Sequence, residues 1–185
     1  MEGINSGMTY LALLRGINVG GKNQLPMKLL AEWFAEEGCS GVRSYIQSGN
    51  VVFSASKSVA ARIPRRVSAQ IAERFGYKVP LVMRSADEMG KVIGNNPFLK
   101  RGVAEQELHV MFLADLPVAG RVANLDPGRS APDAFEVRGR EIYLRLPNGA
   151  GRSKLTNAYF DSKLATISTS RNWRTVTTLV EMMQR

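Results

Sequence analysis

The chain has 185 residues, 44% of them hydrophobic, which is enough for one ordinary domain or two small lobes with a real core. A net charge of +9, from 25 basic and 16 acidic residues, disfavours cationic substrates and favours phosphates, nucleotides or nucleic acid. No apolar run approaches the ~20 residues that cross a bilayer, and the single cysteine, Cys39, allows no intramolecular disulfide. We therefore expect a cytoplasmic protein without a membrane partner.

The first half of the chain predicts the element order strand, helix, strand, strand, helix, strand. The expected ranges are a strand at 10–14, a helix at 26–37, strands at 42–47 and 50–54, a helix at about 59–75 and a strand at 78–84. Ser48-Gly49 is a two-residue hairpin signal. Pro64 leaves undecided whether the first turn of the second helix forms. This order is ferredoxin-like, with the first and third strands central and the fourth at an edge, where Pro80 is tolerated.

The same architecture is expected again in the second half. The ranges are a strand at 108–113, a weak helix at 117–125, hairpin strands at 134–137 and 141–146, a helix at 153–164, a strand at 165–169 and a final helix from Asn172. The predicted division is an extension or cloning remnant at 1–7, a first lobe at 8–94, a connector at 95–107 and a second lobe with a C-terminal helix at 108–185. The predicted fold class is α+β, with two ferredoxin-like lobes of mostly antiparallel sheet.

The loop after the first strand has the composition of an anion site. From Gly16 the spacing is G-x-x-x-x-G-K, a phosphate-loop match in which Asn23 replaces the Ser or Thr that would bind magnesium. Glycines let consecutive N–H groups face one point, and Arg15, Lys22 and a following helix start add positive charge. Phosphate binding without NTPase chemistry is the favoured interpretation, and a structural or solvated loop is the alternative.

Strand directions bring more polar residues to this loop and to a second cluster. In each lobe two parallel strands end together, so their following loops gather glycines, amide side chains and two cations. The candidate ligand-binding residues are Arg15, Asn18, Gly20, Gly21, Lys22, Gln47, Ser48 and Asn50 in the first lobe and Ser153, Lys154, Arg171 and Asn172 in the second.

Each of these candidates also has an ordinary structural role. Hairpin geometry alone explains Ser48, and Ser153 is more simply a helix N-cap than a nucleophile with Lys154 as its base. Asn172 is expected to cap the last helix and Trp173 to lie in the core, which leaves Arg171 as the expected ligand contact. No His, Cys or carboxylate cluster has metal-ligand spacing, so no metal site is expected.

Five segments together resemble the bacterial domain-of-unknown-function family 1697. They are Leu13–Lys22, Tyr45–Phe53, Asn96–Phe98, Gly151–Asn157 and Thr169–Val176. The resemblance covers nearly the whole chain from Met8. It implies a cytoplasmic α+β protein of two ferredoxin-like lobes, and it implies no activity, cofactor or catalytic residue.

The leading hypothesis is a cytoplasmic binding protein or enzyme for a phosphorylated small molecule or nucleotide. The anion would be held in a cleft between the first-lobe loop and the second-lobe residues Lys154 and Arg171. The first alternative is a nucleic-acid-binding module, although the basic residues are spread over both halves and the third strand offers only Phe53 for stacking. The second alternative is a non-catalytic interaction protein whose motifs are structural. The sequence identifies no catalytic residue and no cofactor.

Overall fold

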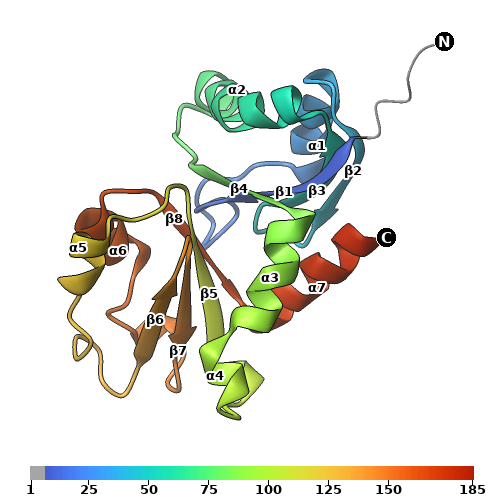
Figure 1. Ribbon diagram of the computed structural model, residues 1–185. Coiled ribbons are helices and arrows are strands. Elements are labelled where there is room, and N and C mark those ends of the chain that lie inside the picture. The colour runs from blue at the N-terminus through green and yellow to red at the C-terminus, as the bar shows by residue number, and fades with distance from the viewer. Residues whose placement is uncertain (1–6) are drawn as a thin grey trace. The chain divides into compact units, whose positions relative to one another are not determined.

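The computed structural model describes residues 7–185, so the expected extension at 1–7 falls, except for Gly7, outside the described residues. The chain divides into two compact units. One runs to Met89 and takes in Leu179–Arg185, and the other is formed by Gly90–Thr178. Each contains a four-stranded antiparallel sheet with helices, which confirms the predicted α+β fold with two lobes (Figure 1).

The first unit has the strand order of a ferredoxin-like lobe. Its elements are β1 (Met8–Leu14), α1 (Met27–Glu36), β2 (Ser40–Tyr45), β3 (Asn50–Ala55), α2 (Lys57–Phe75) and β4 (Leu81–Ser85). The sheet order is β2-β3-β1-β4, and every neighbouring pair is antiparallel. As predicted, β1 and β3 are central, β1 and β2 run parallel, and β4 is an edge strand. The strand was expected at 78–84 with Pro80 inside it, but it begins at Leu81, just after the proline.

Helices α1 and α2 cover one face of this sheet (Figure 1). α1 buries Leu30, Trp33 and Phe34 at helical spacing and ends before Gly38, whose φ of 94° is left-handed. The core beneath the two helices consists mainly of strand residues Ala12, Leu14, Val51, Phe53, Ala55 and Leu81 and helix residues Ala60, Ile63, Val67 and Ile71. The opposite face is apolar too, because Leu11, Leu13, Val52 and Val82 are also buried.

Helix α2 starts earlier than the sequence predicts. The Ser56 hydroxyl accepts a hydrogen bond from the Val59 N–H and caps the helix, which then contains Pro64 in its interior. The helix ends as predicted at Phe75, where Gly76 adopts a left-handed φ of 75°.

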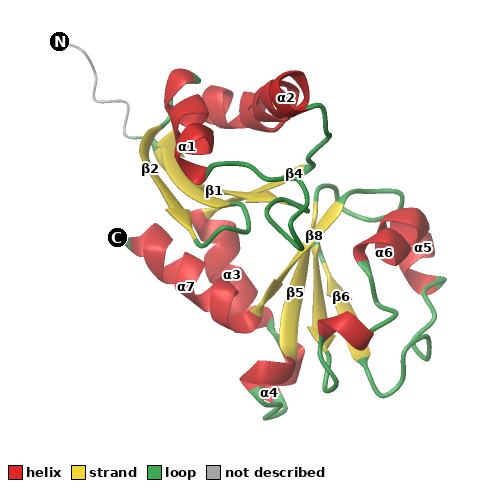
Figure 2. Ribbon diagram, turned by 180° about the vertical axis from the view of Figure 1, so that it is seen from behind, coloured by secondary structure: helices red, strands yellow, loops and turns green. Residues whose placement is uncertain are grey.

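The second unit repeats the arrangement. Its elements are the end of α3 (Ala86–Asn95), α4 (Pro97–Lys100), a 3₁₀ turn at Glu105–Glu107, β5 (Leu108–Leu113), α5 (Ala119–Ala123), β6 (Ala134–Arg138), β7 (Glu141–Arg145), a 3₁₀ turn at Ala150–Arg152, α6 (Asn157–Leu164), β8 (Ser168–Asn172) and the first half of α7 (Trp173–Gln184). The sheet order β6-β7-β5-β8 matches the first unit, and α5 and α6 lie side by side on one face (Figure 2).

Three predicted boundaries are wrong. The first hairpin loop has four residues, 46–49, because β2 and β3 pair only as far as Tyr45 and Asn50. Helix α6 begins at Asn157 rather than 153, since Thr156 and not Ser153 accepts the capping bond from the Tyr159 N–H. The last strand runs from Ser168 rather than 165, because Ala165 is left-handed at φ 53° and ends α6.

Candidate functional site

The loop between β1 and α1 is built from backbone angles that favour glycine and asparagine. Its left-handed residues are Gly16 (φ 73°), Asn18 (53°), Gly20 (58°), Gly21 (73°) and Asn23 (49°). Glycine adopts this region without steric cost, and asparagine tolerates it better than other side chains. A Cβ atom at Gly16, Gly20 or Gly21 would meet nothing within 4 Å, so these glycines serve the backbone angles rather than close packing.

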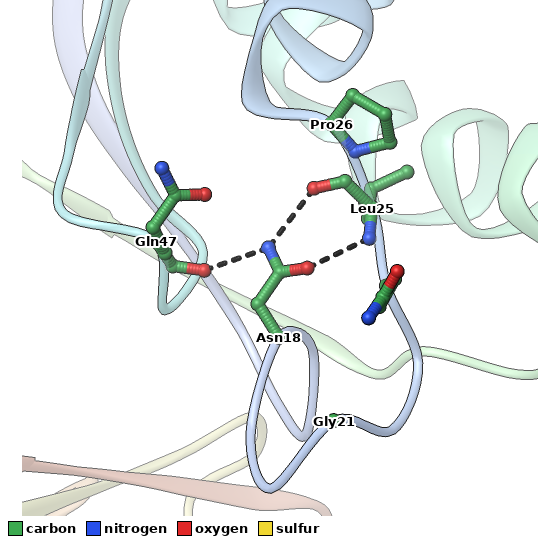
Figure 3. A pocket seen from close by; sticks show the side chains of 6 residues that line it. Asn18, Gly21, Leu25, Pro26 and Gln47 are labelled. Carbon is green, nitrogen blue, oxygen red and sulfur yellow. Dashed lines mark hydrogen bonds between the residues drawn. The ribbon is translucent and has the colours of Figure 1, made fainter.

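Asn18 holds this loop in place. Its Nδ2 atom donates to the carbonyl oxygens of Leu25 (2.9 Å) and Gln47 (2.8 Å), and its Oδ1 atom accepts from the Leu25 N–H at 2.7 Å (Figure 3). Asn23 acts similarly, because its Nδ2 atom donates to the Gly16 carbonyl at 2.9 Å. The side-chain amide of Asn18 thus joins two loops, and the expected contact of Asn18 with a ligand stays a prediction.

Two backbone N–H groups at the tip of the loop lack an acceptor among the described residues. The Lys22 N–H donates to the Val19 carbonyl at 3.0 Å, which makes Gly20 and Gly21 the two central residues of a tight turn. The N–H groups of Gly20 and Gly21 have no acceptor among residues 7–185. Since the loop is fixed from within, these two donors are oriented before any ligand arrives.

The neighbouring hairpin tip is packed rather than open. The Gly49 carbonyl accepts from the Leu14 N–H at 2.8 Å, and a Cβ atom at Gly49 would lie 2.7 Å from the Leu14 Cβ. Asn50 is buried, and its Nδ2 atom donates to the Tyr45 carbonyl (3.0 Å) and the Ser48 hydroxyl (2.9 Å). The structure thus gives Ser48 and Asn50 hydrogen-bonding roles inside the hairpin.

An open pocket of about 340 Å³ lies where the two loops meet the start of α1 (Figure 3). The residues that line it are Asn18, Gly21, Gln24, Leu25, Pro26 and Gln47. Pro26 precedes α1 without a side-chain cap, and the first turn of α1 contains no acidic residue. The positive end of the helix dipole is therefore uncompensated at this pocket.

Of the residues expected at this site, Asn18, Gly21 and Gln47 line the pocket, whereas Arg15 and Lys22 do not. The side chain of Lys22 is exposed and has no hydrogen bond or ion pair with any described residue, and Arg15 is half-buried. Sequence reasoning missed Gln24, whose carbonyl accepts from the Tyr77 hydroxyl at 2.8 Å. No local signal connects two residues 53 positions apart, so only the fold could show this contact.

The second predicted cluster is not assembled in the same way. Arg171 is buried and donates to the Thr169 hydroxyl and the Ser170 carbonyl, both at 2.8 Å. Burial lowers the pKa of its guanidinium to about 10. Asn172 caps α7 as predicted, because its Oδ1 atom accepts from the Thr175 N–H at 2.8 Å. Trp173 is buried in the core, also as predicted.

Ser153 and Lys154 lie on the other side of the second sheet from Arg171. Arg171 pairs with Val110, on the face opposite the core beneath α5 and α6. The Lys154 carbonyl accepts from Arg129, whose guanidinium stacks 4.0 Å from the Tyr159 ring of that core. Ser153, expected to cap a helix, instead accepts from the Leu155 N–H at 3.0 Å, a local turn.

Among residues 7–185 the structure shows neither a reactive thiol nor a cluster of metal ligands. Cys39 is buried, and burial together with the nearby Glu37 carboxylate raises the pKa of its thiol to about 11, far from a reactive thiolate at neutral pH. No group of three His, Cys, Asp or Glu side chains among residues 7–185 is placed to hold a metal ion. No helix in the same range combines the length and the apolar character needed to span a bilayer.

Comparison with known proteins supports the fold and the family. No curated protein matches the chain. A solved structure, the conserved bacterial protein SP0830 from Streptococcus pneumoniae, is similar to it with a TM-score of 0.70 and 21% identity, over 97% of this chain and 100% of that one. The family model described as "Protein of unknown function (DUF1697)" matches residues 8–143. The chain therefore belongs to the DUF1697 family.

Proposed function

We propose that this is a cytoplasmic protein that binds the phosphate of a phosphorylated small molecule or nucleotide at the β1–α1 loop. One observation carries the proposal. The side-chain amides of Asn18 and Asn23 form hydrogen bonds that hold the loop in place, while the N–H groups of Gly20 and Gly21 and the ammonium of Lys22 have no partner among the described residues. Donors that are fixed in advance bind an anion without an ordering cost.

The charges around the pocket favour the same ligand. Residues 15–31, which form the loop and the first turns of α1, include three cations and no carboxylate. The uncapped start of α1 adds a partial positive charge. A phosphate dianion would meet only attractive groups along this segment.

The structure does not support magnesium-dependent NTPase chemistry at this loop. Asn23 stands where a hydroxyl would bind magnesium, and its amide donates to the Gly16 carbonyl. Lys22 lies five residues before the first residue of α1, Met27, and the sheet is antiparallel. We therefore propose binding and derive no reaction.

The second-lobe cations are left out of the proposed site. Lys154 and Arg171 lie on opposite faces of their own sheet, and Arg171 is buried among its own hydrogen-bond partners. The expectation that they complete one cleft with the β1–α1 loop stays a prediction.

The test is thermal stabilisation by inorganic phosphate, AMP, ATP and a panel of sugar phosphates. A ligand at a hundredfold excess over its dissociation constant should raise the free energy of unfolding by ~2.7 kcal/mol. Lys22→Gln should reduce this stabilisation, and the matched control Lys57→Gln, which removes an exposed cation at the start of α2, should leave it unchanged. No stabilisation by any phosphate compound would refute the proposal.

A further inference from the structure

The fold gathers cations that are far apart in the sequence at one end of the first sheet. Three segments meet there, 15–31, 46–50 and 74–81. The Arg15 N–H donates to the Pro80 carbonyl at 3.1 Å, and the Tyr77 hydroxyl donates to the Gln24 carbonyl at 2.8 Å. The hydrogen bond from the Asn18 side chain to the Gln47 carbonyl joins segment 46–50 to the same end. We call this surface the basic end.

The basic end contains five cations and no Asp or Glu. They are Arg15, Lys22, Lys28, Arg74 and Lys78. The side chains of the last four are exposed and form no hydrogen bond or ion pair within residues 7–185. The nearest carboxylates along the chain, Glu32 and Glu73, border the three segments from outside. The sequence contains no dense basic stripe, so this concentration of charge arises only from folding.

Two exposed aliphatic side chains stand among these cations. Val19 on the β1–α1 loop is 61% exposed, and Ile46 on the β2–β3 hairpin is 53% exposed. Ile46 also has a φ of 50°, a left-handed angle that costs a β-branched residue free energy. A strained, exposed isoleucine at a loop tip contributes nothing to the core, which points to a contact outside the chain.

We propose that the basic end binds a single-stranded nucleic acid. This proposal rests on the proposed function, since one phosphate of the strand occupies the Gly20–Gly21 turn. A single phosphate dianion balances about two cations, so a ligand that matches the four exposed cations Lys22, Lys28, Arg74 and Lys78 must contain more than one phosphate. Lys28 on α1, Arg74 in the last turn of α2 and Lys78 just beyond that helix provide contacts for the phosphates that follow.

The apolar side chains decide between kinds of polyanion. Inorganic polyphosphate has no apolar part, and a duplex hides the faces of its bases. An unpaired strand exposes base faces, against which Val19 and Ile46 can pack. Because these side chains are aliphatic rather than aromatic, stacking is weak, and little sequence preference is expected.

This surface differs from the sheet face through which ferredoxin-like lobes can bind RNA. Phe53, the only aromatic residue expected to stack on a base, is buried against Phe34 on the helix-covered face. The other face is closed as well, because Leu11, Leu13 and Val52 are buried. Binding through the sheet face is therefore excluded, and the end of the sheet is the surface that remains.

The experiment is fluorescence anisotropy of a labelled 12-nucleotide oligothymidylate over a range of salt concentrations. For four phosphate contacts to a single strand, the logarithm of the binding constant should fall against the logarithm of salt with a slope of about −2.8. Lys22→Gln, Lys28→Gln, Arg74→Gln and Lys78→Gln should each reduce that slope by about 0.7. Lys57→Gln is the matched control, because it removes a cation from the opposite end of α2, roughly 25 Å from Arg74.

The aliphatic contacts are tested with Val19→Ser and Ile46→Ser. These variants should weaken oligothymidylate binding several-fold while leaving the salt slope unchanged, and a duplex of the same length should bind more weakly than the single strand. Equal losses from Arg74→Gln and Lys57→Gln would overturn the proposal, as would tighter binding to vesicles of anionic phospholipid than to the oligonucleotide.

One result would separate this proposal from the proposed function. If inorganic phosphate stabilises the protein through Lys22 but the oligonucleotide binds no more tightly than AMP, the basic end does not bind a strand. The phosphate site at the β1–α1 loop would then stand alone.

Discussion

The glycine-containing loops of the two lobes have similar composition and opposite hydrogen bonding. In the β1–α1 loop, Asn18 and Asn23 turn their amides inward, and the Gly20 and Gly21 N–H groups and the Lys22 ammonium have no partners among the described residues. In the β7–α6 loop of the second lobe, the Lys154 N–H donates to Ser130 and its carbonyl accepts from Arg129. The comparison teaches that glycines and cations alone do not make a ligand site. What matters is which polar groups the protein has already used.

The largest expected difference between the lobes is at their hairpin turns. Gly49→Ala places a methyl group 2.7 Å from the Leu14 Cβ at a φ of 81°, so it should lower the free energy of unfolding by about 3–4 kcal/mol. Gly139→Ala in the second lobe also has a positive φ, 60°, but its nearest neighbour is the Glu141 carboxylate at 3.9 Å. Gly139→Ala should lower the free energy of unfolding by only about 1–2 kcal/mol. Urea denaturation of both variants measures the difference, and equal losses would show that Gly49 is not a packing constraint.

The next effect compares asparagines. Asn18→Ala removes three hydrogen bonds that fix the β1–α1 loop and should cost about 2–3 kcal/mol of unfolding free energy. Asn148→Ala, at an exposed residue beside the 240 Å³ pocket of the second lobe, removes no hydrogen bond to a described residue and should cost less than ~0.5 kcal/mol. Thermal denaturation of the two proteins provides the test. A small effect of Asn18→Ala would mean that the loop is not fixed by this side chain.

A smaller effect is expected for the two exposed lysines. Lys22→Gln should weaken phosphate binding about fivefold, which corresponds to ~1 kcal/mol, because it removes one charge from the site. Lys154→Gln should not change the affinity, because Lys154 belongs to a loop whose backbone groups are already used. Isothermal titration with inorganic phosphate compares the two. A greater loss from Lys154→Gln would shift the anion site to the second lobe.

Features that depend on local sequence were predictable. The apolar spacing of α1, the glycine after it and the Asn172 cap all follow from short-range rules, and the experimentally solved structure of the similar streptococcal protein supports the fold as a whole. The direction of the strands also followed from the element order, and it correctly placed the β1–α1 loop beside the hairpin tip.

Features that depend on tertiary contacts were not predictable. The polar neighbours Ser170 and Asn172 suggest that Arg171 is exposed. Arg171 is instead buried, on the face of the sheet opposite the core beneath α5 and α6. Ser153 has the side chain of a helix cap, but α6 begins later, and Thr156 accepts the capping hydrogen bond from the Tyr159 N–H. The basic end could not be predicted because Lys22 and Lys78 are 56 residues apart, and their segments meet through the tertiary contacts of Tyr77 with Gln24 and of Arg15 with Pro80.

The most direct test of the account is the ¹⁵N–¹H spectrum of the protein during titration with inorganic phosphate. The Gly20 and Gly21 amide signals should shift and saturate, because their N–H groups are the proposed donors, and the signals of Gly149 and Gly151 in the second lobe should stay in place. A spectrum in which Gly20 and Gly21 do not move, or in which all four glycines move alike, would contradict the account.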